Sequence, residues 1–202
     1  MCFGVILGWV IGVQQAGGRF SAAPAATAAA PGGQGAPAGQ PQAPPLDEAR
    51  VQSLMTVIKN DPKNAGAAVQ LGNTYFDAER YPDAIKWYEE SLRIDPSNPD
   101  ASTDLGVSFY YTGQTDRALQ QFTQSLKLDP KHTKTLLNQG IVLAFGKQDL
   151  AGAQASWKQV VELAPGTPEA QAAQRALEGI TAAGHGATPP ANPPATAATP
   201  GT

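Results

Sequence analysis

The chain repeats one short run four times: IKNDP at residues 58–62, LRIDP at 92–96, LKLDP at 126–130 and VELAP at 161–165. The closing prolines, Pro62, Pro96, Pro130 and Pro165, are 34, 34 and 35 residues apart. Each run ends an amphipathic stretch, and proline cannot continue a helix because it lacks an N–H and clashes with the preceding turn. The runs therefore predict four helices that each end just before a proline.

A period of about 34 residues is typical of a helical-repeat solenoid. In such a fold each helix pair is too small to bury its own apolar face, and stacked neighbours complete the core. The spacing of the prolines therefore predicts an array of short, stacked helix pairs.

Other residue types recur in register within the same period. They are the Leu-Gly pairs Leu71-Gly72 and Leu105-Gly106, continued by Gln139-Gly140; then Tyr75, Phe109 and Leu143; then Ala84, Ala118 and Ala153; then Tyr88, Phe122 and Trp157. With the closing proline, this pattern resembles the tetratricopeptide repeat (TPR). We expect the glycine and alanine to lie where the two helices of a pair cross, and the aromatic rings to fill the space between one unit and the next.

The resemblance implies an all-α, right-handed superhelical TPR solenoid of three helix pairs with flanking capping helices. The expected pairs are Ala65–Ala78 with Tyr81–Arg93, Pro99–Thr112 with Thr115–Leu128, and Thr133–Phe145 with Leu150–Leu163. The repeats then cover about 65–98, 99–132 and 133–167, and the caps cover 47–60 and 167–180. The TPR domain as a whole is expected at 46–183.

The third unit is one residue longer than the second. Gly140 and Trp157 are 17 residues apart, whereas Gly106 and Phe122 are 16 apart. We expect the extra residue in the turn near Gly146–Asp149, with a slight splaying of the third helix pair.

The two flanks of the domain have a different composition. Residues 15–45 are almost entirely Ala, Pro, Gly and Gln, with Arg19 as the only charge, and residues 184–202 contain no Asp, Glu, Lys or Arg. Neither stretch has enough apolar surface to offset the entropy of ordering its backbone. We therefore predict a disordered linker at 15–45 and a disordered tail at 184–202.

Residues 1–14 form an uncharged apolar leader, MCFGVILGWVIGVQ. It is shorter than the ~18–20 residues that span a bilayer as a helix, so two interpretations remain. It is a transmembrane anchor that lacks its first residues because the start is set too late, or it is a disordered or interfacial leader. We favour the anchor because Gly4, Gly8 and Gly12 form two overlapping GxxxG motifs, by which membrane helices pack closely. We expect a bacterial inner-membrane location with the TPR domain in the periplasm; the cytoplasmic face stays open as the alternative.

The resemblance also implies a concave groove lined by the first helix of each pair. Its expected residues are those not assigned to packing: Val69, Asn73, Phe76 and Asp77; Thr103, Val107, Tyr110 and Tyr111; and Lys134, Leu137, Ile141 and Phe145. The set is mostly aromatic and aliphatic with a few polar groups, which is typical of a peptide- or helix-binding groove. The alternative is that some of them, such as Ile141 and Phe145, pack against the closing helix or a neighbouring unit. Tyr110 and Tyr111 are the strongest candidates for ligand contact.

Chaperone-binding TPR domains hold a C-terminal carboxylate with lysine, asparagine and arginine side chains. Only Asn73 and Lys134 match that clamp, while Val69, Asp104 and Asn138 occupy its other positions. Asp104 would repel a carboxylate. We therefore expect no co-chaperone activity.

No pattern in the sequence predicts catalysis or a cofactor. The segment GIVLAFGKQ (140–148) has five residues between its glycines and Gln148 where a phosphate loop needs Ser or Thr. Cys2 is the only cysteine, and His132 and His185 fall in a turn and in the tail, so we expect no disulfide within the chain and no Cys- or His-based metal site. The net charge of −3 without a basic stripe argues against nucleic acid.

These observations predict a non-enzymatic scaffold or adaptor that binds a protein, as a peptide or a helix, in the TPR groove and is tethered to a membrane. The alternatives are a self-assembling structural TPR protein, with homo-oligomers, and an assembly factor for envelope complexes such as those of cytochrome c maturation. The last alternative is an analogy of fold and layout.

Overall fold

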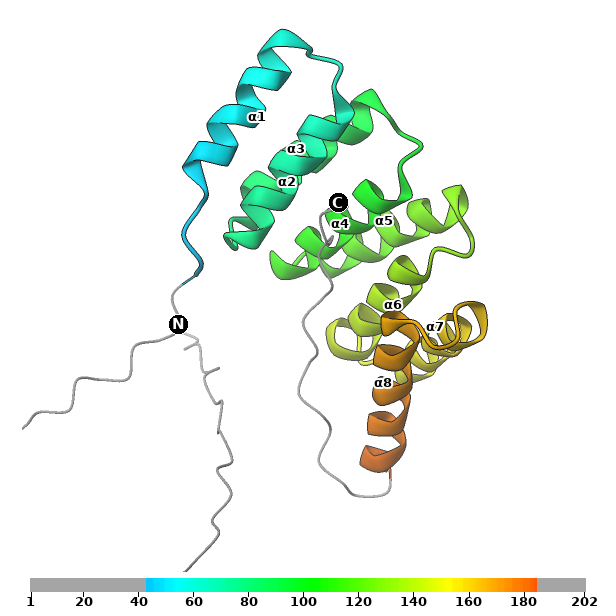
Figure 1. Cartoon of the computed structure of the whole chain (residues 1–202). Helices are drawn as coiled ribbons and strands as arrows, with labels where there is room; N and C mark the ends of the chain where they lie inside the picture. The colour runs from blue at the N-terminus through cyan, green and yellow to red at the C-terminus, as the bar shows by residue number, and fades with distance from the viewer. Residues whose placement is uncertain (1–42, 185–202) are drawn as a thin grey trace, which may run out of the picture. The chain divides into compact units, whose positions relative to one another are not determined.

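The structure, a computed structural model, describes residues 43–184, with side chains to residue 182. Within that part of the chain every regular element is a helix (Figure 1). In chain order these are α1 (Glu48–Asn60), α2 (Ala65–Asp77), α3 (Tyr81–Ile94), α4 (Pro99–Tyr111), α5 (Thr115–Leu128), α6 (Thr133–Ile141), the π-helix η1 (Val142–Gly146), α7 (Leu150–Leu163) and α8 (Pro168–Gly184). The predicted anchor and almost all of the predicted linker and tail lie outside the described residues.

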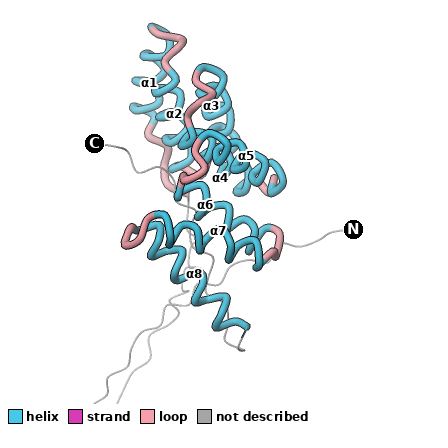
Figure 2. Tube along the Cα trace, turned by 90° about the vertical axis from the view of Figure 1, so that its right-hand side faces the viewer, coloured by secondary structure: helices cyan, strands magenta, loops and turns pink. Residues whose placement is uncertain are grey.

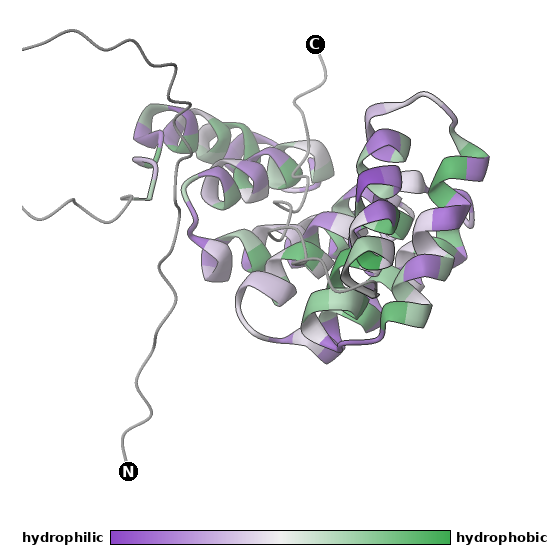
Figure 3. Cartoon of the chain, turned by 90° about the horizontal axis from the view of Figure 1, so that it is seen from below, coloured by the Kyte–Doolittle hydropathy of each residue, from purple (hydrophilic) through white to green (hydrophobic). Residues whose placement is uncertain are grey.

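The predicted TPR solenoid is confirmed. Three antiparallel pairs, α2 with α3, α4 with α5, and α6–η1 with α7, follow one another, and α1 and α8 flank them (Figures 1 and 2). Each helix packs on the next in the chain, so the core runs from one pair into the following one. Polar and apolar residues alternate along the helices, as expected when each helix buries one side (Figure 3).

The helices end at the aspartate–proline steps for a visible reason. Asp61, Asp95 and Asp129 are the C-caps of α1, α3 and α5, with extended ψ angles of 89°, 93° and 99°. A following proline disfavours helical dihedral angles at the residue before it, so the helix does not extend further. Each aspartate also accepts a hydrogen bond from the backbone N–H two residues on, at Lys63, Ser97 and Lys131. The repeated Asp-Pro thus ends one pair and starts the turn into the next.

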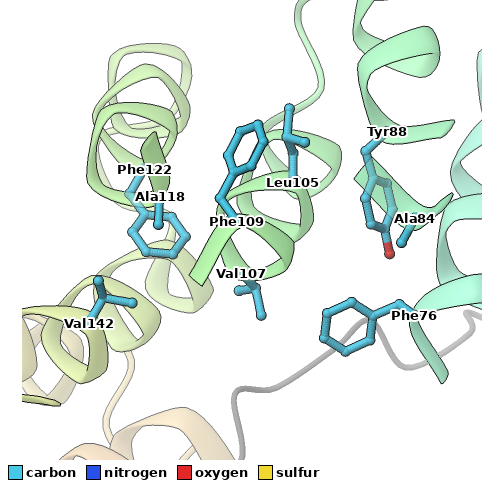
Figure 4. Packing of buried hydrophobic residues seen from close by; sticks show 9 residues of the cluster. All are labelled: Phe76, Ala84, Tyr88, Leu105, Val107, Phe109, Ala118, Phe122 and Val142. Atoms are coloured by element: carbon cyan, nitrogen blue, oxygen red, sulfur yellow. The ribbon is translucent and has the colours of Figure 1, made fainter. Parts of the chain in front are cut away.

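Each glycine of the series lies under an aromatic ring of its own pair. A Cβ atom added at Gly72 would lie 2.5 Å from the ring of Tyr88, and one at Gly106 would lie 2.5 Å from the ring of Phe122. Trp157 covers Gly140 in the same way. The rings also belong to the core that joins successive pairs, where Tyr88 and Phe122 share one apolar cluster with Leu105 and Phe109 (Figure 4). They therefore fill the crossing within a pair as well as the space between units.

The extra residue of the third unit is not in the turn, contrary to the prediction. All three turns have three residues, 78–80, 112–114 and 147–149, with a positive φ at the middle one (Glu79, Gly113 and Gln148). The first helix of the third pair is longer instead, because it ends in the π-helix η1, where Lys147 N–H donates to the carbonyl of Val142. A π-turn takes one more residue than an α-turn. The insertion is therefore absorbed inside the helix.

No helix within residues 43–184 is both long and apolar enough to cross a bilayer. The apolar leader that carries the anchor prediction lies outside this range.

Candidate protein-binding face

The glycines fix which side of each first helix faces its partner. Gly72, Gly106 and Gly140 lie against α3, α5 and α7. With 3.6 residues per turn, a residue two positions before the glycine lies roughly 160° around the helix from it. We call the side of α2, α4 and α6 that points away from α3, α5 and α7 the first-helix face. The predicted groove includes residues of this side, such as Asp77 and Tyr111, and residues nearer the glycine side, such as Phe76 and Tyr110.

The residues predicted for the groove differ widely in exposure. Asp77, Tyr111 and Phe145 are exposed, and Val69, Asn73, Tyr110 and Lys134 are partly buried. The remaining five are buried: Phe76, Thr103, Val107, Leu137 and Ile141. In this conformation the buried five pack within the fold, and their contact with a ligand stays a prediction.

Thr103 is buried because it belongs to a hydroxyl network between α4 and α6. Its Oγ1 lies 2.6 Å from Oγ1 of Thr135, which lies 2.6 Å from Nδ1 of His132, and Nε2 of His132 lies 3.3 Å from Oδ1 of Asp100. A carboxylate, an imidazole and a hydroxyl in series are also the arrangement of a hydrolase nucleophile. Here the Thr135 hydroxyl is fully buried and cannot reach a substrate. The network instead orders the junction of the second and third units.

An aromatic cluster, formed by Phe76, Tyr81 and Tyr111, lies where α2 and α4 end. The rings of Tyr81 and Tyr111 are stacked with centroids 4.6 Å apart, and Phe76 meets both edge-on at 5.2 and 5.7 Å. Burial raises the pKa of Tyr81 to about 12, with smaller contributions from Glu79 and Tyr111. The cluster holds Tyr111 in place while 39% of that residue stays exposed.

The clamp positions are engaged by the protein itself. Asn73 Oδ1 accepts a 2.7 Å hydrogen bond from the Tyr88 hydroxyl. Lys134 Nζ lies 2.7 Å from Asp104 Oδ1 and 3.9 Å from Asp100 Oδ1, so its charge is already paired. Both residues that match a carboxylate clamp thus have partners within the protein.

Asp104 is the most unusual ionisable group of this face, because only 2% of the residue is exposed. Burial raises its pKa, and the Lys134 ammonium opposes that shift. The neighbouring Asp100 shows the opposite behaviour, since the hydrogen bond with His132 holds its pKa below the ordinary value and Lys134 adds to this effect. The second and third units therefore share a small ionic cluster.

A second surface was not predicted from the sequence. A depression of about 510 Å³ lies between α3, α4 and α5, on the side of the second helices, and is lined by Glu89, Leu92, Arg93, Leu105, Phe109, Arg117, Gln120, Gln121 and Gln124. The Arg117 guanidinium lies 3.9 Å from the centroid of Phe109 and 3.3 Å from a carboxylate oxygen of Glu89. The groove prediction from the sequence considered only the first helix of each pair. The polar faces of α3 and α5, which line this depression, could have indicated a second surface.

Among residues 43–184 there is no cluster of His, Cys, Asp or Glu side chains placed to hold a metal ion.

Comparison with known proteins agrees with this architecture. Two family profiles match the chain, one described as TPR repeat over residues 72–113 and one described as tetratricopeptide repeat over residues 103–166. No curated protein sequence matches. Residues 72–166 therefore contain tetratricopeptide repeats.

Several solved structures share the fold. MamA is 20% identical, with a TM-score of 0.58 over 67% of this chain and 77% of that one. The first TPR domain of Spaghetti (RPAP3), solved bound to the HSP90 peptide SRMEEVD, is 26% identical, with a TM-score of 0.53 over 60% of this chain and 96% of that one. The Yersinia enterocolitica type III secretion translocator chaperone SycD is 19% identical, with a TM-score of 0.54 over 62% and 96%. The described part of the chain thus has the fold of these TPR domains.

Proposed function

We propose that this protein is a non-enzymatic adaptor that binds a peptide or helix of a protein partner on the first-helix face. The observation that carries the proposal is the placement of Tyr111, whose ring stacks on that of Tyr81 while 39% of the residue stays exposed. A rigid aromatic side chain loses little entropy on binding and offers a large apolar surface, and such residues dominate the energy of protein interfaces. Phe145 on η1 adds a second exposed aromatic, 40% accessible.

The structure of the Spaghetti (RPAP3) domain with its HSP90 peptide supports peptide binding by a domain of this kind. We do not propose that this chain binds the same acidic peptide. Asn73 and Lys134 have internal partners, and Asp104 adds a negative charge to the same face.

The double variant Tyr110→Ala/Tyr111→Ala tests the proposal, with Leu163→Ala as the matched control because Leu163 is equally exposed but lies on α7. A photo-crosslinking amino acid at Phe145 in the full chain gives the readout in native membranes. We expect the double variant to lose its crosslinked partner band while the helical circular-dichroism signal and the control stay unchanged. An undiminished band would show that the first-helix face is not the binding surface.

We also propose, on the sequence alone, that residues 1–14 tether the protein to the inner membrane of a bacterium with the TPR domain in the periplasm. Membrane fractionation, with protease added to intact spheroplasts, tests both parts. Wholly soluble protein, also when expressed from an upstream start codon, would contradict the tether, and a protected TPR domain would contradict the periplasmic side.

Self-assembly is the alternative that one observation favours. Helix α1, the first in the described part of the chain, exposes Met55 and Val57, 45% and 39% accessible. Sedimentation of the full chain across a hundredfold concentration range separates the two functions, because an adaptor stays monomeric and a structural protein associates. A Met55→Ser/Val57→Ser variant should abolish any association that uses this helix. An assembly factor for envelope complexes would be a special case of the adaptor.

A further inference from the structure

Apart from Oδ1 of Asp104, which faces Nζ of Lys134, two buried oxygen atoms on the first-helix face have no hydrogen-bond donor among the described residues: Oδ2 of Asp104 and Oδ1 of Asn138. The residues are 2% and 1% exposed. The orientation of the Asn138 amide follows from its surroundings, because its Nδ2 donates to the carbonyl of Lys134 at 2.9 Å and a carbonyl oxygen can only accept. Its Oδ1 is therefore an acceptor, and buried acceptors are nearly always paired in native proteins.

The two oxygens belong to residues that share one neighbour, Lys134, and form what we call the acceptor patch. Asp104 and Asn138 hold the same position in successive repeats, each two residues before the glycine that faces the second helix. Lys134 connects them, since its backbone carbonyl holds the Asn138 amide and its Nζ lies 2.7 Å from Oδ1 of Asp104. Because α4 and α6 are also in direct contact, the acceptors lie on adjoining helices of the same face.

The acceptor patch has an excess of negative charge as well as an excess of acceptors. With both carboxylates ionised and His132 neutral, Asp100 and Asp104 face a single lysine, Lys134, which leaves one negative charge. A group with both a positive charge and several N–H donors would satisfy the two together. The guanidinium of arginine and the ammonium of lysine are the peptide groups with these properties.

We propose that the first-helix face selects partner segments that carry a basic side chain, whose N–H groups pair with Oδ2 of Asp104 and Oδ1 of Asn138. The proposal rests on the proposed function, that this face binds a peptide. It reverses the charge preference of a carboxylate clamp at the same positions. Lys134 is the side chain that can move to admit the ligand, because 16% of it is exposed and its long stem is flexible.

The test compares two small probes of nearly the same shape added to the full chain, N-acetyl-arginine amide, which is charged, and N-acetyl-citrulline amide, which is neutral and has fewer N–H donors. Isotope-edited NMR follows the side-chain signals of Asn138 and the carboxyl carbon of Asp104. We expect saturable shifts with the arginine probe and about tenfold weaker binding of the citrulline probe, since charge-assisted hydrogen bonds are about twice as strong as neutral ones. In Asp104→Asn the preference should disappear, whereas in the control Glu162→Gln, which removes the same charge from the exposed side of α7, it should remain.

Equal shifts with both probes would overturn the selection of charge and would indicate an ordinary amide or a water molecule as the donor. No shift at either residue with both probes would overturn the site itself. Neither result changes the outcome expected of the crosslinking test at Phe145, because that test uses the whole partner protein. The variant Asn138→Leu, with its fold checked by circular dichroism, should also bind the arginine probe more weakly. Unchanged binding by this variant would remove Asn138 from the site.

Discussion

Nζ of Lys134 lies 2.7 Å from Oδ1 of Asp104, and this ion pair joins the first helices of the second and third repeats. Asp104 is nearly inaccessible, so it has lost its hydration and depends on the lysine for compensation. Removing one partner of such a pair leaves a buried charge, which costs far more than removing both. The pair therefore gives a sharp stability test.

Lys134→Met should lower the free energy of unfolding by about 3 kcal/mol, because it leaves Asp104 buried without its cation. The double variant Asp104→Leu/Lys134→Met should recover to within about 1 kcal/mol of the original protein. Urea unfolding followed by circular dichroism measures both. A double variant that is less stable than Lys134→Met would contradict this account.

The same pair predicts a dependence on pH. Burial raises the pKa of Asp104 above its ordinary value of 3.8, so the folded state holds the proton more tightly than the unfolded chain does. The stability that this proton provides is fully present below pH 3.8 and is lost as pH rises through the folded-state pKa. Since Lys134 opposes the raised pKa, the defect of Lys134→Met should shrink between pH 7 and pH 4. A defect that is constant across this range would exclude Asp104 as its origin.

Gly106→Ala should destabilise the protein by about 1–3 kcal/mol, the usual cost of overpacking a core. The added Cβ would lie 2.5 Å from the Phe122 ring and 3.2 Å from the carbonyl of Ala118, which is backbone and cannot move aside. Gly66→Ala is the matched control, because its Cβ would find only ordinary contact at 3.5 Å. That control should be neutral or stabilising by about 0.5–1 kcal/mol, as alanine is preferred over glycine in helices. Thermal unfolding of the two variants measures both changes in stability.

Deleting Gly146 should leave the protein folded and at least as stable, because it shortens η1 by the one residue that distinguishes a π-turn from an α-turn. The three-residue turn that follows would keep its place. Deleting Gln139 is the contrasting control, since it rotates the preceding residues by roughly 100° and removes Leu136 and Leu137 from the core. We expect a clearly lower midpoint of urea unfolding in the control alone.

The Tyr81 hydroxyl should lose its proton only at an unusually high pH. Burial raises its pKa to about 12, compared with the ordinary value of 10.0. The stability linked to its proton is complete below pH 10 and is lost as pH rises through 12. Ultraviolet titration of the phenolate band should show a late-titrating tyrosine that disappears in Tyr81→Phe. If that variant and the original protein titrate alike, the late group is another tyrosine.

The fold was largely predictable because its determinants are local and repeated. The Asp-Pro steps end helices through backbone geometry alone, and α5 and α7 begin and end at the residues expected for them. The glycine series marks helix crossings wherever it occurs. The π-helix was missed because a spacing of 17 instead of 16 residues shows that an insertion exists without showing which backbone turn accepts it.

The binding face was less predictable because exposure depends on neighbours in three dimensions. Thr103 has a residue type suited to a polar groove, yet it is buried by hydrogen bonds to Thr135, 32 positions away. Val107 and Leu137 are apolar at the expected helix positions and are buried as well. Tyr111 and Phe145 stay exposed. Helix periodicity identifies the side of a helix, but not whether that side is covered.

The pairing of Asp104 with Lys134 also bears on how freely such an array can be rearranged. In an idealised repeat protein the units are interchangeable, and one can be duplicated, removed or moved. Here the position of Lys134 is taken by Asp100 one unit earlier, and that of Asp104 by Gln70. Exchanging the second and third units would separate the lysine from its carboxylate and bury an uncompensated charge. A single salt bridge therefore fixes the order of these two units, and they cannot be interchanged without a loss of stability.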